Sequence, residues 1–277
     1  MSSLAGGPAG IRMAVLDVDG TLLTSDARLT GATVAAVGRA RARGLEVCLA
    51  TSRGPGGLRW VVGRLGLEAW AVAYQGALVG RLDRAGSLAA PPLAERPLPA
   101  AAARVVLAEA AGMGLSASWF AGPGWFALAD DAATRREAGI VRDTFVVAGP
   151  PADGHNPHKL MLIAGHPALV PSLHDLARRL PPDCAGHFSH DNYLEVTRAD
   201  VDKAQALADL AARLGIPLAE MAAVGDGQND LGLLRAVGLP IAMGNAKPAL
   251  KQVAAFVTGS NDEDGVAAAL DRLTGGS

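Results

Sequence analysis

Two short acidic segments, each directly after an apolar run, constrain the fold of this chain more than any other feature. Residues 17–21 (Asp-Val-Asp-Gly-Thr) follow the run 13–16, and residues 225–230 (Gly-Asp-Gly-Gln-Asn-Asp) follow the run 221–224. Uninterrupted apolar runs of this length are typical of buried parallel strands, and open α/β sheets hold their ligands at the carboxyl ends of such strands. Both sets of carboxylates should therefore emerge at one edge of a parallel sheet.

Carboxylates gathered in this way predict a site for a hard cation. Mg²⁺ is usually held by one or two carboxylates together with substrate phosphate and water, and a free aspartate beside it can attack phosphorus. One Asp after a strand is more often the N-cap of the next helix, but two clusters together favour the cation site.

Two other ligand sites do not match the sequence. A calcium loop needs its glycine at the sixth position, whereas Gly20 is fourth in its segment. The pair Gly225 and Gly227 lacks the third glycine of a dinucleotide fingerprint, and residues 54–57 do not follow its spacing either. A nucleotide cofactor is therefore not expected.

Length and charge limit the remaining possibilities. A chain of 277 residues allows two domains or one core with a substantial insertion. The formal charge of −2 provides no general field for nucleic acid or an anionic membrane, so neither is expected as a partner. Cys48 and Cys184 have neither disulfide nor metal-ligand spacing. The first twelve residues lack the regions of a secretion signal, so we expect a cytoplasmic protein.

The first part of the chain predicts a βαβαβ unit. Strands are expected at 12–17, 45–51 and 69–74, with helices at 30–43 and from the Gly/Pro turn after Arg53 to about residue 65. Strands that alternate with helices in this way predict a doubly wound, Rossmann-like parallel sheet, and hence an α/β fold.

The pattern changes after about residue 82, where a Pro-rich connection leads to a second α/β unit with expected antiparallel pairing. Its predicted elements are a helix at 100–111, strands at 115–120 and 125–128, a helix at 132–139, a strand at 158–164, a helix at 167–180 and a strand at 188–196.

The last part of the chain returns to the pattern of the first. Its predicted elements are a helix at 202–214, a strand at 221–225, a helix at 229–236, a strand at 239–243 and helices at 247–253 and 265–273. The middle unit should therefore be inserted into a single sheet domain. We expect core segments at 1–84 and 195–277 with a cap domain at 85–194.

Four segments, taken together, resemble the signature motifs of the haloacid dehalogenase superfamily of phosphatases. They are residues 17–23, 50–53, 201–204 and 225–230, in the order of the superfamily's motifs. The long interval between the second and third is similar to that of the Cof-like branch, whose members insert an α/β cap there, and residues 242–246 are a further mark of that branch. The resemblance covers nearly the whole chain.

The resemblance implies the roles of the acidic residues. Asp17 would be the nucleophile that becomes an aspartyl phosphate, which divides a difficult hydrolysis into two displacements. Asp19 would be the general acid and base, close to the nucleophile. Mg²⁺ would be held by the side chains of Asp17 and Asp226 and the backbone carbonyl of Asp19, with Asp230 ligating or orienting beside it.

The resemblance also implies a phosphate-binding set. The Thr51 hydroxyl would bind the transferring phosphoryl oxygens, helped by backbone N–H groups of the turn that begins at Ser52. Lys203 would pair with Asp17 and the phosphoryl group, and Asn229 would orient a carboxylate or contact phosphate. Taken alone, Thr51 would more often be a cap and Lys203 a solvated surface residue.

Substrate contacts are expected near the second motif and in the cap. Where Cof-like proteins commonly have Asn-Gly-Ala and often Thr-Gly-Arg, this chain has Gln75-Gly76-Ala77 and Thr51-Ser52-Arg53, so a contact near the leaving group is altered. The candidate substrate residues are Arg53, Gln75, Gly76, His190, Asp191 and Asn192. The six histidines all fall in the insertion, and their spacing favours surface or pocket positions over a zinc site. The aromatic residues at 119–126 are expected in the cap core, although Trp125 could stack on a sugar face.

These observations predict a Mg²⁺-dependent phosphatase that acts on a small phosphorylated metabolite, with a sugar phosphate as the best single choice. The near alternative is a phosphotransferase of the phosphomutase kind, which uses the same aspartate but returns the phosphoryl group to substrate. A catalytically idle binding protein on the same fold is the alternative from another class. Oligomeric state and the identity of the substrate are not predicted.

Overall fold

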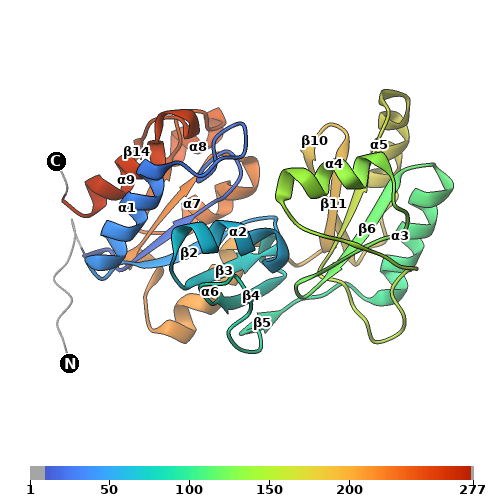
Figure 1. Cartoon of the computed structure of the whole chain (residues 1–277), viewed down its shortest axis with the longest axis horizontal. Coiled ribbons are helices and arrows are strands. Elements are labelled where there is room, and N and C mark those ends of the chain that lie inside the picture. Colours follow the sequence, from blue (N-terminus) through green and yellow to red (C-terminus); the bar gives the residue numbers. More distant parts are fainter. Residues whose placement is uncertain (1–9, 276–277) are drawn as a thin grey trace.

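Two β-sheets with helices packed on them form two lobes that lie side by side (Figure 1). The computed structural model describes residues 10–275, so residues 1–9 of the expected first core segment lie outside the described part. Within residues 10–275, one sheet has eight strands in the order β14-β13-β12-β1-β2-β3-β4-β5, and the other has six in the order β10-β11-β9-β6-β7-β8. In this same part of the chain no helix combines the length and the apolar character needed to cross a membrane.

The larger sheet, which we call the core sheet, has β1 (Met13–Leu16) at its centre. This strand pairs in parallel with β2 (Glu46–Ala50) on one side and with β12 (Met221–Gly225) on the other. The chain continues from β2 to β3 on one side of β1, whereas β12 and the later strands lie on the other side. The strand order therefore reverses between β1 and β12, and such a switch point is where open α/β sheets bind ligands.

The remaining core elements complete the doubly wound pattern predicted from the sequence. The strands are β3 (Ala69–Ala73), β4 (Leu78–Leu82), β5 (Ala94–Glu95), β13 (Leu239–Ala242) and β14 (Phe256–Val257). The helices are α1 (Gly31–Ala42), α2 (Pro55–Leu65), α6 (Lys203–Leu214), α7 (Leu231–Ala236), α8 (Pro248–Val253) and α9 (Gly265–Leu273). Helix α1 packs with α2 and α9, while α7 packs with α6 and α8.

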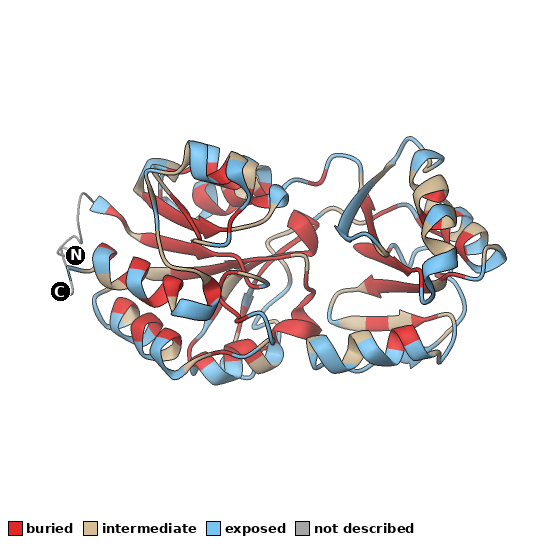
Figure 2. Cartoon of the chain, turned by 90° about the horizontal axis from the view of Figure 1, so that it is seen from above, coloured by how far each residue is buried: buried red, intermediate tan, exposed pale blue. Residues whose placement is uncertain are grey.

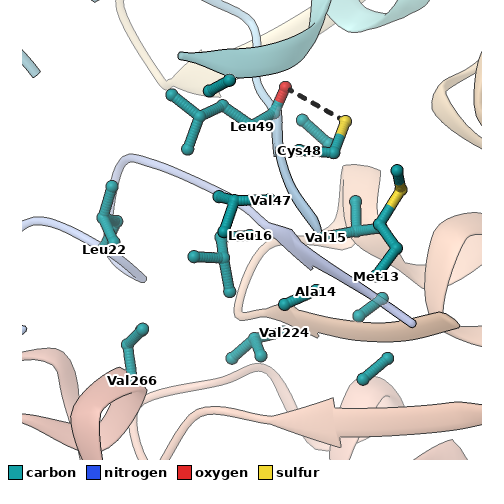
Figure 3. Close-up of a cluster of buried hydrophobic side chains, with 14 of the residues drawn as sticks. Met13, Ala14, Val15, Leu16, Leu22, Val47, Cys48, Leu49, Val224 and Val266 are labelled. Atoms are coloured by element: carbon teal, nitrogen blue, oxygen red, sulfur yellow. Dashed lines mark hydrogen bonds between the residues drawn. The ribbon is translucent and has the colours of Figure 1, made fainter. Parts of the chain in front are cut away.

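Burial follows the core strands, as expected for a sheet that is covered on both faces. Figure 2 shows buried residues concentrated along the strands, while the helices are only partly buried. The side chains of β1, β2 and β12 form an apolar cluster with Leu22 and Val266 (Figure 3). Cys48 belongs to this cluster, and burial raises the pKa of its thiol to about 12, so the thiol stays protonated at neutral pH.

Strand β4, which the sequence did not predict, runs antiparallel to β3 and pairs with β5 at the sheet edge. The connection between β3 and β4 is too short for the crossover that a parallel strand needs. It reverses the chain through Tyr74 and Gln75, whose φ values are 52° and 61°. Non-glycine residues seldom occupy this left-handed region, so composition alone did not indicate the turn.

The six-stranded sheet and its helices form the cap. Its strands are β6 (Ser116–Ala121), β7 (Gly124–Ala127), β8 (Val146–Val147), β9 (Lys159–Ile163), β10 (Cys184–His190) and β11 (Tyr193–Arg198). Its helices are α3 (Ala100–Gly112), α4 (Ala132–Val141) and α5 (Val170–Arg178). One face of the sheet packs with α3 and α5 in a separate apolar cluster, and side chains of the other face cluster with core residues such as Tyr74.

The single strand predicted at 188–196 is wrong, because two antiparallel strands meet there. Strands β10 and β11 are joined at Asp191 and Asn192, with His190 opposite Tyr193. Asp and Asn are favoured in tight turns. The strand-like residues on both sides of them nevertheless led to the prediction of one continuous strand.

The two crossings between core and cap suggest domain boundaries. Strand β5 still pairs within the core sheet, and β11 still pairs with β10 of the cap sheet up to Arg198, where the strand ends. We therefore propose junctions near residues 96 and 199, in place of 84/85 and 194/195.

Candidate active site

The two acidic segments meet at the carboxyl ends of the adjacent strands β1 and β12, as the sequence predicts. Asp17, Asp226 and Asp230 each offer a carboxylate oxygen, and these oxygens lie within 4.8 Å of one another. The Asp17 backbone N–H donates to the Val224 carbonyl at 3.0 Å, which ties the two segments together. Asp17 and Asp230 are buried, with exposed fractions of 5% and 0%. We call these three residues the carboxylate cluster.

Lys203, the first residue of α6, joins two members of this cluster. Its ammonium donates to Asp17 Oδ1 and Asp230 Oδ1, both at 2.8 Å, and to the Ala50 carbonyl at 3.0 Å. All three N–H donors of the lysine are therefore used. The Asp202 side chain accepts from the Ala204 and Gln205 backbone N–H groups, so an N-cap fixes Lys203 at the start of the helix.

The charges in the cluster perturb one another. Burial raises the pKa of Asp17 well above its usual value; the neighbouring Asp230 raises it further, against the opposing effect of Lys203. Burial also raises the pKa of Asp226 to about 6, although a hydrogen bond from Thr21 opposes this shift. Burial alone would lower the pKa of Lys203, but the Asp17 and Asp230 carboxylates raise it, so the ammonium stays charged. The site thus brings together three carboxyl groups and one ammonium group.

Gly20 allows the first acidic segment to approach Asp226. Its φ is +78°, and a Cβ atom at this position would lie 2.5 Å from Asp226 Oδ2. Two hydrogen bonds hold this turn in place. The Thr21 hydroxyl donates to Asp226 Oδ1 at 2.8 Å, and the Asn245 amide donates to the Gly20 carbonyl at 2.8 Å. The turn therefore depends on glycine both for its backbone conformation and for its space.

A Gly20→Ala substitution should displace the Asp226 carboxylate. Left-handed strain and the close contact together should lower the free energy of unfolding by about 1 to 3 kcal/mol, and cation affinity should fall with it. Gly38→Ala is a matched control, because Gly38 lies in α1 and a Cβ atom there would meet nothing within 4 Å, and the change there should stabilise slightly. Denaturant unfolding and a Mg²⁺ titration measure both effects; equal behaviour of the two variants would contradict this account.

Asp19 lies apart from the carboxylate cluster, in an ion pair with Arg53. The guanidinium donates from Nη2 to Asp19 Oδ1 at 2.7 Å and from Nε to Oδ2 at 2.8 Å. The Arg53 side chain is 4% exposed, whereas that of Asp19 is 52% exposed. Arg53 Nη1 also donates to the Val141 carbonyl of α4 in the cap, at 3.2 Å. This two-bond geometry fixes the orientation of the Asp19 carboxylate.

Thr51 and Ser52 form the turn between β2 and α2. The buried Thr51 hydroxyl accepts from the Arg53 backbone N–H at 3.1 Å, so the hydroxyl caps the turn. The Ser52 carbonyl accepts from Lys159 of the cap at 3.0 Å. Helix α2 begins at Pro55 after the N-cap Gly54, and its first N–H groups form the kind of helix N-terminus that attracts anions.

Gln75, Gly76 and Asn229 lie where the β3–β4 turn meets α6 and the second acidic segment. The Asn229 amide donates to Gln75 Oε1 at 3.2 Å. Gly76 has a φ of +110°, and a Cβ atom there would lie 2.6 Å from the Asp202 carbonyl. Gly76 therefore allows the turn to pack on the start of α6, and it does not line the cavity described next.

A cavity of about 440 Å³ lies between the core and the cap. The core contributes Asp19, Ser52 and Arg53, and the cap contributes residues of α4 and of the strands β6, β7, β9, β10 and β11. His190 and Asn192 line it, as expected from the sequence. Asp191 does not, because its carboxylate contacts His174 Nε2 at 3.0 Å on the outside of the hairpin, where its side chain is 83% exposed.

Comparison with known proteins identifies the family. A family described as haloacid dehalogenase-like hydrolase matches residues 14–270. Among solved structures, a haloacid dehalogenase-like hydrolase from Bacteroides thetaiotaomicron is 26% identical, with a TM-score of 0.84, and the match covers 95% of this chain and 99% of that one. A haloacid dehalogenase-like hydrolase from B. subtilis is 23% identical, with a TM-score of 0.80 and coverages of 95% and 100%.

A sugar phosphatase described as HAD subclass IIB is 20% identical, with a TM-score of 0.75 and coverages of 94% and 98%. Because the family match spans most of the chain, this protein belongs to the haloacid dehalogenase-like hydrolase family. The resemblance and the α/β fold class predicted from the sequence are confirmed.

Proposed function

We propose that this protein is a Mg²⁺-dependent phosphatase that hydrolyses a small phosphate ester through an aspartyl phosphate. One observation carries the proposal: Asp17 lies in a carboxylate cluster beside Lys203, while Asp19 is held separately and faces the cavity. A nucleophile, a cation site and a separate acid–base group are thus brought to one edge of the sheet.

The residues of the cluster fit Mg²⁺. Carboxylate oxygens are the ligands this cation prefers, and three buried or half-buried carboxylates balanced by one ammonium leave a surplus of negative charge. Asp17, Asp226 and Asp230, with the Asp19 backbone carbonyl, would hold the ion. Bound there, the cation would offset the repulsion between the phosphate ester and the Asp17 carboxylate.

The first displacement would occur at Asp17. Lys203 binds Oδ1, so Oδ2 is the oxygen we assign to the attack on phosphorus. The bond from phosphorus to the leaving oxygen breaks, and the leaving alcohol takes a proton from Asp19. In the second displacement, water attacks the aspartyl phosphate while Asp19 accepts its proton, and inorganic phosphate leaves with Asp17 restored as a carboxylate.

The phosphoryl oxygens would be bound by Thr51, by the N–H groups that follow Ser52 and by Asn229. Lys203 would add its positive charge beside them, while its three N–H groups hold Asp17, Asp230 and the Ala50 carbonyl. Preorganised donors of this kind stabilise charge that develops in the transition state. Arg53 would act indirectly, because its two bonds to Asp19 hold that carboxylate in position.

The substrate would be a small metabolite whose leaving group fills the cavity between core and cap. A volume of about 440 Å³ is typical of pockets for small molecules. Structural relatives described as phosphatases, one of them a sugar phosphatase, favour a sugar phosphate. Transfer of labelled phosphate to substrate in place of water would indicate the phosphomutase-type alternative. The presence of Asp17, Asp19, Lys203 and Asp226 together argues against an idle binding protein.

Metal dependence tests the proposal directly. Hydrolysis of p-nitrophenyl phosphate should stop in excess chelator and return with Mg²⁺. Ca²⁺ should restore it poorly, because its larger and looser coordination shell misplaces the attacking carboxylate. Phosphate release is the measurement, and full activity in excess chelator would refute the proposal.

A further inference from the structure

The turn at residues 51–53, to which the proposed function assigns phosphate binding, has its three carbonyl groups held from two lobes of the molecule. The Thr51 carbonyl accepts from the Gln75 backbone N–H, and the Arg53 carbonyl accepts from the Tyr74 backbone N–H, both at 3.0 Å. These two donors belong to the β3–β4 turn of the core. The carbonyl between them has its partner in the cap.

That partner is Lys159, the first residue of β9. Its ammonium donates to the Ser52 carbonyl at 3.0 Å, although the lysine is only 5% exposed. Alternate residues of a strand face the same side of a sheet, so Lys159 shares its face with Met161 and Ile163, which belong to the apolar cluster between cap and core. A buried charge is costly unless it is hydrogen-bonded, whereas another apolar residue here would extend the cluster. The contact with Ser52 therefore gives the lysine a role that an apolar residue could not fill.

The surroundings of the Lys159 ammonium hold it at the turn. The nitrogen lies over the rings of Phe120 and Tyr74, at 5.0 and 5.9 Å from their centres. It also lies 3.5 Å from Glu195 Oε2, in a pair whose side chains are only 6% and 7% exposed. Aromatic faces and a carboxylate both favour a positive charge. The position of the ammonium is thus fixed before any substrate binds.

The hydrogen bond from Lys159 fixes the peptide group between Ser52 and Arg53. A peptide group is planar, so its carbonyl and its N–H are oriented together. The carbonyl accepts from Lys159, and the N–H donates to Thr51 Oγ1 at 3.1 Å. Because the Thr51 oxygen accepts this bond, its own O–H proton points elsewhere and can be donated to a phosphoryl oxygen. A rotation of this peptide would turn the Thr51 hydroxyl away from that direction.

We propose, on the basis of the proposed phosphatase activity, that Lys159 is a positioning residue for phosphoryl transfer. Its ammonium holds the Ser52 carbonyl and thereby directs the Thr51 hydroxyl towards the phosphoryl group. Lys159 acts through the turn and not through the leaving group. Because the lysine belongs to the cap and the turn to the core, the phosphate-binding turn is complete only while the cap lies on the core.

Lys159→Met tests this role. Methionine is similar in length and suits the apolar surroundings, but it cannot donate to the Ser52 carbonyl. With p-nitrophenyl phosphate and saturating Mg²⁺, kcat should fall by about 10- to 100-fold, as expected when a group that contacts the reacting atoms is misplaced. The value of kcat/KM should fall with it, because the lost interaction serves the transition state. Arg178→Met, which removes an exposed cation on the outer side of the cap, is the control and should keep the wild-type kcat.

A double-mutant cycle with Thr51→Val separates positioning from a merely structural role. Valine has nearly the shape of threonine but lacks the hydroxyl, so Thr51→Val should itself lower kcat by about 10²- to 10³-fold. If Lys159 acts through this hydroxyl, Lys159→Met should lower kcat by less than about threefold in the Thr51→Val background. An equal loss in both backgrounds would mean that Lys159 acts independently of Thr51, and the inference would be overturned.

A second set of variants serves if Lys159→Met fails to fold. Lys159→Met together with Glu195→Gln removes the buried pair as a whole, so no buried carboxylate is left without its cation. Its kcat is then compared with that of Glu195→Gln alone, in which Lys159 is retained. The expected ratio and the cycle with Thr51→Val are the same as for the single variant.

The outcomes separate this inference from the proposed function. If the wild type hydrolyses the ester and Lys159→Met stays within about twofold of its kcat, the role of Lys159 is overturned and the phosphatase proposal stands. If the wild type does not hydrolyse it, the phosphatase proposal fails, and calorimetric titration with inorganic phosphate in the presence of Mg²⁺ decides the role of Lys159. A Kd for phosphate that Lys159→Met raises by about 3- to 10-fold supports the role, whereas equal affinities, or no binding to the wild type, overturn it.

Discussion

Asp17→Asn should abolish turnover and leave the fold intact. The amide keeps the shape of the carboxylate but cannot form the acyl phosphate, and removal of a catalytic nucleophile elsewhere costs on the order of 10⁶-fold in kcat. Phosphate release under saturating Mg²⁺ is the measurement. Asp175→Asn is the matched control, since Asp175 pairs with Arg178 and Arg179 on the outer side of the cap.

The stability of the same variant gives an independent check. Burial raises the pKa of Asp17 in the folded state, so the folded protein binds this proton more tightly than the unfolded chain does. The protein therefore loses stability as pH rises above the usual pKa of an aspartate. At pH 7 and without Mg²⁺, Asp17→Asn should therefore unfold at the same denaturant concentration as the wild type or a higher one. Turnover close to that of the wild type would refute the role of Asp17 as nucleophile. A marked loss of stability would mean that Asp17 is needed for folding.

The sequence predicted the core of the site because strand ends are encoded locally. The apolar runs before Asp17 and Asp226 identify buried strands, and the fold brings their carboxyl ends together at the switch point between β1 and β12. Lys203 was placed through the resemblance of its segment, since nothing in its local sequence indicates a buried lysine. Its three hydrogen bonds come from partners that are distant in the chain.

The sequence did not predict contacts that depend on how the cap meets the core. Arg53 was expected near substrate and it lines the cavity, but its bonds to Asp19 and to the Val141 carbonyl of the cap were not predicted. Lys159 was not singled out, because its burial and its hydrogen bond to the Ser52 carbonyl arise only when the cap packs on the core. Asp191 was expected among the cap residues that contact substrate, but the turn between β10 and β11 directs it outward.

Lys203→Met should destabilise the protein as well as inactivate it. Methionine has a similar length and fills the space, but Asp17 and Asp230 would lose the ammonium that both contact at 2.8 Å. Breaking a buried ion pair by removing one partner costs about 3 to 5 kcal/mol. Lys247→Met is the control, because Lys247 is exposed, and surface changes usually stay within about 0.5 kcal/mol.

The pH dependence of this deficit distinguishes lost charge balance from lost packing. Lys203 opposes the upward shift of the Asp17 pKa, so its removal raises that pKa further. A carboxyl group whose pKa is raised in the folded state binds its proton more tightly there than in the unfolded chain. The free energy of unfolding therefore falls as pH rises from the unfolded-state pKa towards the folded-state pKa. Denaturant unfolding of Lys203→Met should therefore show a larger deficit at pH 8 than at pH 5, and Mg²⁺ should recover part of it by mass action. A deficit that is equal at both pH values and insensitive to Mg²⁺ would mean that Lys203 serves packing alone, and the electrostatic account of the site would then fail.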